Sequence, residues 1–175
     1  MMKKLHLYTG EGKGKTTAAM GLALRCLGHG GRVLVGQFVK DGTSGELMAL
    51  RQMSGVTVLP CPPMKGFATC MTEDDRAAAA QEHTKYAHAL IRVMEDVRPD
   101  CVILDELAMA LTLGMVPADA AQALIEVALR HGETVVTGYA APAWLHDRAD
   151  YVTRMSAQKH PYKTENLPAR RGVEW

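Results

Sequence analysis

The sequence predicts an α/β fold, in which an open and mostly parallel β-sheet is covered by helices on both faces. Short apolar runs alternate with longer helical patterns along the chain, as in successive strand–helix–strand units. A glycine-rich turn follows the first apolar run, and a later apolar run ends in the adjacent carboxylates Asp105 and Glu106. No internal repeat or linker interrupts the alternation, so we expect a single domain over residues 1–175.

The first apolar run, Leu5–Tyr8, predicts a strand, and the glycine-rich turn after it ends in Gly-Lys-Thr at the start of a helix. This order is typical of a phosphate-binding P-loop, in which the glycines let several backbone N–H groups face one anion. Lys15 would then reach the outer phosphates, and the hydroxyl of Thr16 would hold Mg²⁺. The nucleotide-binding residues expected on this basis are Thr9, Gly10, Glu11, Gly12, Lys13, Gly14, Lys15, Thr16 and Thr17.

The turn departs from the usual G-x-x-x-x-G-K-[ST] pattern at one position, because Thr9 stands where the first glycine belongs. An ordinary glycine-rich turn between a strand and a helix is the alternative. The P-loop is favoured because Gly-Lys-Thr lies at the expected junction, whereas the dinucleotide-binding pattern G-x-G-x-x-G does not fit these glycines.

The next segments continue the alternation. Apolar residues go nearly all the way round the predicted helix 14–27, which indicates a mostly buried helix. The run Val33–Val39 predicts a parallel strand covered on both faces. A polar loop, 40–46, follows at the strand end where open α/β sheets bind ligands. We expect a short strand over Val56–Leu59 and an irregular stretch over 60–71.

Thr72 and Asp75 resemble a capping box and predict the start of a long helix that ends near Val97, before Arg98-Pro99. Its apolar stripe is His83, Tyr86, Ala87, Leu90, Ile91 and Met94. Further along the chain, we expect helices over 107–113, 117–130 and 142–147, strands over 134–137 and 151–155, and then an irregular tail.

The buried run Cys101–Leu104 ends in Asp105 and Glu106, where P-loop proteins place the acid that holds Mg²⁺ directly or through water. The expected metal-binding residues are therefore Thr16, Asp105 and Glu106. Alternatively, or at the same time, Asp105 caps the short helix that follows it. With the P-loop, this carboxylate-bearing strand favours a RecA-like P-loop NTPase fold.

The composition narrows the range of partners. A formal net charge of +1 gives no long-range field that favours nucleic acid or an anionic membrane. Neither a signal peptide nor an 18-residue apolar run is visible, and the four cysteines contain no C-x-x-C pair. A reduced, cytoplasmic setting is the expectation.

These landmarks together resemble the P-loop type of ATP:corrinoid adenosyltransferase from Leu5 to Glu174. The loop beginning Thr-Gly at Thr9 is itself a trait of that family. The other matching segments are Gly21–Arg25, Gly28–Gly30, Val33–Lys40 with its Gln-Phe, Gly66-Phe67, Leu104–Glu106, Thr137-Gly138, Ala149–Thr153 and Lys159–Tyr162.

The resemblance implies transfer of the 5′-deoxyadenosyl group of ATP to the cobalt(I) of a corrinoid, with release of tripolyphosphate. ATP and the corrinoid are then the substrates, and Mg²⁺ is the cofactor. The resemblance also implies a reductase or flavodoxin-type protein as the electron donor, and a homodimer as the oligomeric state of the enzyme. The implied catalytic residues are Lys15, Glu106 and Phe67. Reduced cobalt is itself the nucleophile, so the reaction needs positioning and charge stabilisation rather than a general base.

Three features depart from the family pattern. Thr69 stands where the family has a tryptophan near the cobalt, Tyr139 stands where it often has an arginine, and the chain starts only a few residues before the first strand. Other readings of the P-loop are a RecA-type ATPase or nucleic-acid motor, a small-molecule kinase, and a nucleotide-binding module without turnover. The charge and the lack of an arginine-rich lid segment favour the adenosyltransferase.

Overall fold

The computed structural model describes residues 2–62 and 71–173. Within these ranges the chain forms a six-stranded, all-parallel sheet in the order β3-β2-β4-β5-β1-β6. The strands are β1 (Leu5–Thr9), β2 (Val33–Gln37), β3 (Val56–Val58), β4 (Cys101–Asp105), β5 (Glu133–Thr137) and β6 (Tyr151–Arg154). The helices are α1 (Lys15–Gly28), α2 (Gly45–Leu50), α3 (Glu73–Val97), α4 (Leu107–Thr112), α5 (Ala118–His131), α6 (Ala143–Arg148) and α7 (Pro161–Glu165). The predicted open parallel sheet is confirmed.

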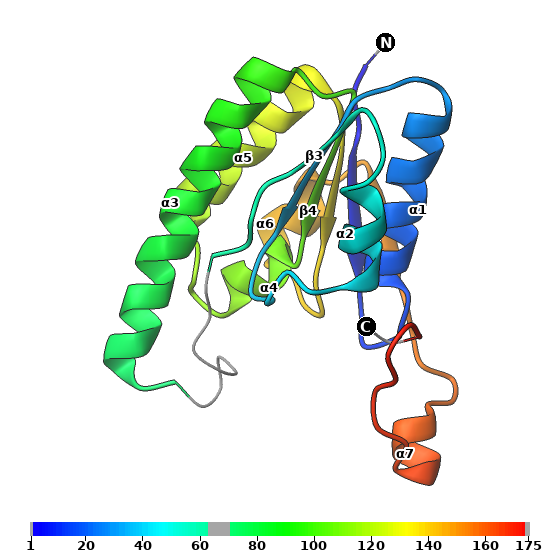
Figure 1. Ribbon diagram of the computed structural model, residues 1–175. Coiled ribbons are helices and arrows are strands. Elements are labelled where there is room, and N and C mark those ends of the chain that lie inside the picture. The colour runs from blue at the N-terminus through cyan, green and yellow to red at the C-terminus, as the bar shows by residue number, and fades with distance from the viewer. Residues whose placement is uncertain (1, 63–70, 174–175) are drawn as a thin grey trace.

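Helices cover both faces of the sheet, with α3 and α5 on one side and α1 and α2 on the other (Figure 1). Successive strand residues point to opposite faces, so each strand contributes to two hydrophobic clusters. Leu34 and Val102 pack under α3 and α5, whereas Val35 and Ile103 pack under α1. This two-sided burial explains why β2 and β4 are continuous apolar runs in the sequence.

The strand order places the functional loops together. Because all the strands are parallel, the loops that follow β1, β2, β4 and β5 leave the same edge of the sheet. Strands β2 and β4 are neighbours, and their register sets Gln37 directly beside Asp105. Strand β5 lies between β4 and β1, which carries the predicted P-loop.

Most predicted elements are confirmed within a residue or two, including the cap of α3. Thr72 accepts a hydrogen bond from the backbone nitrogen of Asp75 at 3.2 Å, and His83, Tyr86 and Leu90 on this helix are buried. The short helices α2 and α7 were not expected, because each is too short to show a clear apolar period.

Two expectations are wrong. Helix α1 is not buried all round: Ala19, Met20 and Ala23 face the sheet, whereas Leu24 is 52% exposed, because the sheet contacts one side of the helix only. The residue that precedes α4 as its N-cap is Glu106, at a φ of 59° and without a side-chain cap bond. Asp105 therefore does not cap this helix and is free for another role.

In the part of the chain that the structure describes, no helix combines the length and the apolar character needed to span a bilayer. The resemblance assigned a catalytic role to Phe67 and noted a departure at Thr69, and both positions lie outside the described residues.

Candidate active site

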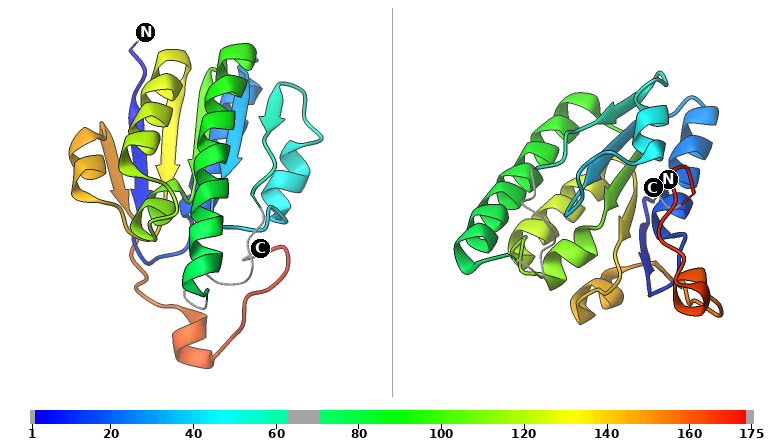
Figure 2. Two further views of the ribbon diagram at one scale, coloured as in Figure 1. Left: turned by 90° about the vertical axis from the view of Figure 1, so that its left-hand side faces the viewer. Right: turned by 60° about the horizontal axis from the view of Figure 1, so that its bottom comes forward.

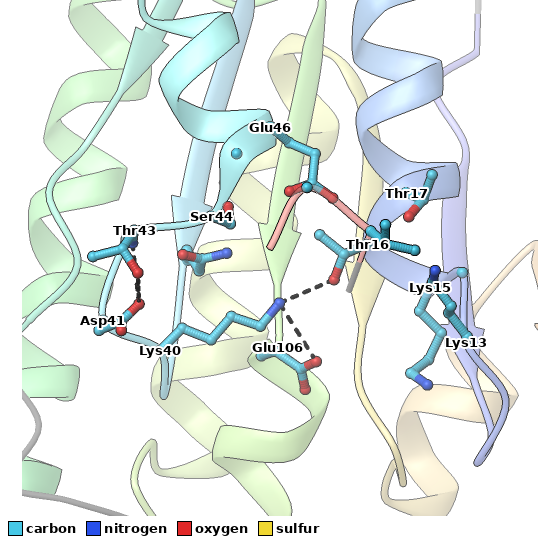
Figure 3. Close-up of a pocket in the computed structure, with 15 residues that line it drawn as sticks. Lys13, Lys15, Thr16, Thr17, Lys40, Asp41, Thr43, Ser44, Glu46 and Glu106 are labelled. Carbon is cyan, nitrogen blue, oxygen red and sulfur yellow. Dashed lines mark hydrogen bonds and ion pairs between the residues drawn. The ribbon is translucent and has the colours of Figure 1, made fainter. Parts of the chain in front are cut away.

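A pocket of about 640 Å³ opens at the carboxyl edge of the sheet, where α1 begins (Figure 3). Its volume is within the usual range for small-molecule sites. Four separate parts of the sequence line it: the end of the P-loop, the end of β2 with the stretch that follows it, Glu106, and the C-terminal segment. The lining residues are Lys13, Gly14, Lys15, Thr16, Thr17, Gln37, Lys40, Asp41, Thr43, Ser44, Gly45, Glu46, Glu106, Gly172 and Val173.

Residues 9–12, the first half of the predicted P-loop, anchor the loop to neighbouring backbone and do not line the pocket. The backbone nitrogen of Gly10 donates to the carbonyl of Tyr139 at 3.2 Å, and that of Gly12 donates to the carbonyl of Met155 at 2.8 Å. These two N–H groups therefore do not face an anion, contrary to the expectation. Positive φ angles of 104° at Gly10 and 114° at Gly14 account for the glycines at both positions.

Thr9 and Glu11 also lie away from the pocket lining. The hydroxyl of Thr9 donates to the carbonyl of Tyr139 at 3.2 Å, and Glu11 forms an ion pair with Arg154 at 3.5 Å. Of the nine predicted nucleotide-binding residues, residues 13–17 thus line the pocket. Residues 9–12 lie outside the lining and anchor the loop.

Lys15 turns back onto its own loop. Its ammonium donates to the carbonyl of Gly10 at 2.7 Å and to that of Gly12 at 2.8 Å. Burial lowers the pKa of Lys15, although the negative charge of Glu106 opposes that shift. Lys15 is the first residue of helix α1, and the first N–H groups of a helix lack intrahelical partners and favour a bound anion.

Asp105 is the centre of a hydrogen-bond network at the ends of three strands. Its Oδ1 accepts from the hydroxyl of Thr16 at 2.9 Å and from that of Thr137 at 2.7 Å. Its Oδ2 accepts from the side-chain amide of Gln37 at 2.9 Å and from the ammonium of Lys40 at 2.8 Å. Burial would raise the pKa of Asp105, but the charge of Lys40 and these donors hold it below its ordinary value. The fully buried carboxyl is therefore ionised.

Glu106 faces the pocket one residue further on. Its backbone nitrogen donates to the hydroxyl of Thr137 at 2.9 Å, and its Oε1 lies 3.8 Å from the ammonium of Lys40. A left-handed backbone at a non-glycine residue is uncommon and is typical of functional sites. Burial raises the pKa of Glu106, and the neighbouring charge of Asp105 acts in the same direction, while Lys40 opposes it.

The list of site residues drawn from the sequence missed Gln37, Lys40 and Thr137. Each had a visible signal, because Gln37 is polar within an apolar run and Thr137 ends another such run. Lys40 opens the polar loop at the ligand-binding end of β2. The sequence did not show that Asp105 is the hydrogen-bond partner of all three side chains, because no local pattern reveals contacts between distant residues.

The predicted metal-binding residues fit Mg²⁺. Thr16, Asp105 and Glu106 offer a hydroxyl and carboxylates, the hard oxygen ligands that Mg²⁺ prefers. The structure already places a cation among them, the ammonium of Lys40. The buried Oε1 of Gln37 has no hydrogen-bond partner among the described residues, so it remains available to accept from metal-bound water.

The described residues contain no group of three or more His, Cys, Asp or Glu side chains arranged to hold a metal ion. Such a group is not required here. Mg²⁺ in nucleotide sites takes one or two carboxylates and receives its other ligands from phosphates and water.

Comparison with known proteins identifies the family. A family model described as "ATP:corrinoid adenosyltransferase BtuR/CobO/CobP" matches residues 2–175 of this chain. The corrinoid adenosyltransferase of Pseudomonas aeruginosa is 34% identical over 171 residues, which cover 98% of this chain and 83% of the relative. Corrinoid adenosyltransferase CobA of Salmonella typhimurium is 30% identical, and the Escherichia coli K12 protein is 32% identical; each match covers 97% of this chain and 84% of the relative.

The matched range covers nearly the whole chain, and the P-loop, the carboxylate pair and the residues that line the pocket lie within it. ATP and a corrinoid are the substrates that this family implies. The chain therefore belongs to the ATP:corrinoid adenosyltransferases, the enzymes that the resemblance in the sequence predicted.

Proposed function

We propose that the pocket binds the polyphosphate of ATP between the P-loop residues 13–17 and Glu106, so that C5′ of the ribose is presented to the corrinoid. The observation that carries this assignment is the cluster of Thr16, Lys40 and Asp105 beside the amino end of α1. It joins a cation-binding group to an anion-binding helix end within one pocket.

The reaction is a displacement at carbon. The electron pair of cobalt(I) forms the cobalt–C5′ bond, the C5′–O bond breaks, and its electron pair leaves with tripolyphosphate, so cobalt becomes formally cobalt(III). No proton moves to or from the reacting atoms. This fits an ionised Asp105 whose oxygens are committed to hydrogen-bond donors and which does not act as a base.

The side chains of the pocket would stabilise the charge that grows on the leaving oxygen. Lys15 rotates from the carbonyls of Gly10 and Gly12 toward the polyphosphate, and the first N–H groups of α1 add to its effect. We propose that Thr16, Asp105 and Glu106 hold Mg²⁺ and orient the polyphosphate. When bound, Mg²⁺ supplies charge neutralisation at the phosphate oxygens. We further propose, from the family resemblance alone, that Phe67 serves as an apolar cover that keeps water off the cobalt.

Three finer assignments remain proposals that the resemblance supports. A reductase or flavodoxin-type protein supplies the electron that makes cobalt(I), since the displacement requires that oxidation state. The enzyme works as a homodimer, which size-exclusion chromatography with light scattering would test. Its setting is the reducing cytoplasm, where the reduced substrate survives.

The test is to mix the protein with Mg·ATP and chemically reduced corrinoid. We expect a light-sensitive cobalt–carbon product and tripolyphosphate, identified by phosphorus NMR. ADP and inorganic phosphate without tripolyphosphate would instead show an ATPase or kinase and overturn the proposal.

Lys15→Ala should lower the rate of adenosyl transfer at least a hundredfold, because one preorganised charge-stabilising group contributes about 3 kcal/mol to such a step. Lys85→Ala, which replaces an exposed lysine of α3 outside the pocket lining, is the matched control. Unchanged turnover of Lys15→Ala would remove the P-loop lysine from the mechanism.

A further inference from the structure

Lys40 lines the pocket and extends toward Thr16 and Glu106 (Figure 3), and its ammonium also contacts the buried carboxylate of Asp105. Its ammonium is 2.8 Å from Oδ2 of Asp105, 3.0 Å from the hydroxyl oxygen of Thr16, and 3.8 Å from Oε1 of Glu106. Lys40 lines the pocket and is 31% exposed, whereas Asp105 is fully buried and is not part of the lining. The lysine therefore covers Asp105.

The ammonium uses the same oxygen lone pairs that a metal ion would need. Thr16 donates its hydroxyl hydrogen to Oδ1 of Asp105, so the lone pairs of its oxygen are what Lys40 contacts. Mg²⁺ binds oxygen at about 2.0–2.1 Å, so an ion held by Thr16 and Oδ2 of Asp105 would overlap the position of the ammonium. The two cations cannot share these oxygens.

The backbone that carries Lys40 is held in a strained conformation. Val39 has a φ of 45°, which is unfavourable for a β-branched residue. Its backbone nitrogen donates to Nε2 of the buried His83 at 3.1 Å. The nitrogen of Phe38 donates to the carbonyl of Asp105 at 2.8 Å. Strain of this kind persists only where the surroundings enforce it, and here it directs the next side chain toward Asp105.

We propose that Lys40 is a positioning residue that competes with the metal ion for Thr16 and Asp105. Its ammonium holds these oxygens in place and competes with free divalent cations for them. A metal ion bound to a polyphosphate displaces the ammonium, because the negative charge of the polyphosphate attracts the lysine away from Asp105. The ammonium then moves to the pocket wall, within the space that the polyphosphate enters. This inference rests on the metal site proposed above.

The first test measures Mn²⁺ binding by electron paramagnetic resonance, with the metal alone and no nucleotide. Lys40→Ala should bind Mn²⁺ at least tenfold more tightly than the unaltered protein, because the competing cation is gone and Asp105 is open to the pocket. Lys85→Ala, which replaces an exposed lysine of α3, should leave the affinity unchanged. Equal or weaker Mn²⁺ binding by Lys40→Ala would overturn the inference.

A second measurement needs no variant at Lys40 and so does not depend on that variant folding. Reductive methylation of the unaltered protein is followed at each lysine by mass spectrometry, without metal and with Mn²⁺ in enough excess to fill the competed site. Methylation of Lys40 should become severalfold faster when Mn²⁺ is bound, while Lys85 reacts at an unchanged rate. An unchanged rate at Lys40 would contradict displacement.

Failure of this inference can be separated from failure of the metal site itself. Thr16→Val removes the hydroxyl at nearly constant shape and should weaken Mn²⁺ binding in the presence of ATP. If Thr16→Val binds Mn²⁺ and ATP as the unaltered protein does, the proposed metal site is wrong. If Thr16→Val loses Mn²⁺ but Lys40→Ala gains no affinity, only the role of Lys40 is wrong.

Discussion

Asp105 links the ends of neighbouring strands because both oxygens of its carboxylate accept hydrogen bonds from side chains around it. Thr16 and Lys40 approach it from the pocket, whereas Gln37 and Thr137 approach it from the neighbouring strands. A buried carboxylate of this kind stays ionised only while its partners remain. Asp105 therefore has a structural role beside its proposed role in metal binding, and we expect the protein to be sensitive to its substitution.

We predict that Asp105→Asn lowers the free energy of unfolding by about 2 to 3 kcal/mol, measured by urea denaturation. The change removes the buried charge and leaves Lys40 and Gln37 facing an amide; partial exposure of Lys40 moderates the loss. Glu126→Gln breaks an exposed ion pair with Arg148 and should change stability by less than about 0.5 kcal/mol. Equal effects of the two substitutions would contradict the buried network.

At the scale of elements, α3 controls the end of β2. His83 accepts from the nitrogen of Val39, and its Nδ1 lies 2.8 Å from the carbonyl of Ala79, a pair of contacts that requires the neutral ring with its hydrogen on Nδ1. Tyr86 adds a second contact, because its hydroxyl accepts from the nitrogen of Gln37 at 3.0 Å. The helix therefore fixes the segment from which Lys40 extends.

This arrangement predicts a pH dependence. Burial lowers the pKa of His83 below its ordinary value of 6.5, so the unfolded chain takes up a proton more readily than the folded one. The free energy of unfolding should fall as the pH drops below 6.5, and this contribution should level off once the pH is below the folded-state pKa.

His83→Gln should remove that part of the slope in urea denaturation curves recorded across the range. His88→Gln, at an exposed position of the same helix, is the matched control. A slope that is the same in His83→Gln and in the unaltered protein would show that His83 does not link protonation to folding.

At the scale of the whole molecule, the pocket is lined by parts of the chain that lie far apart in the sequence. After α7, which projects from the body, the chain runs back to the side of the sheet covered by α1 and α2 (Figure 2). There Gly172 and Val173 join the P-loop residues in lining the pocket. Both residues are otherwise exposed, so they contribute to the site more than to the core.

Deletion of residues 170–175 should therefore raise the Kd for ATP between about three- and tenfold, as expected when contacts on the order of 1 kcal/mol are lost. The urea midpoint without nucleotide should stay unchanged. Isothermal titration calorimetry provides the measurement, and Lys163→Ala, at an exposed position in α7 outside the pocket lining, is the control. An unchanged Kd would mean that the C-terminal segment only borders the site.

The sequence by itself determined the strands, the long helix with its Thr72 cap, the P-loop and the carboxylate pair. These features follow from contacts within a few residues, so their patterns are visible locally. It also carried enough matching motifs to indicate the family, which the comparisons confirm.

Only the tertiary structure decided which residues meet. Lys40 and Asp105 are 65 residues apart, and the parallel pairing of β2 with β4 brings them together. The same folding exposed one side of α1, committed the N–H groups of Gly10 and Gly12 to neighbouring carbonyls, and took Asp105 away from the cap of α4. Each outcome depends on strand order and on what packs against a residue, and local periodicity contains neither.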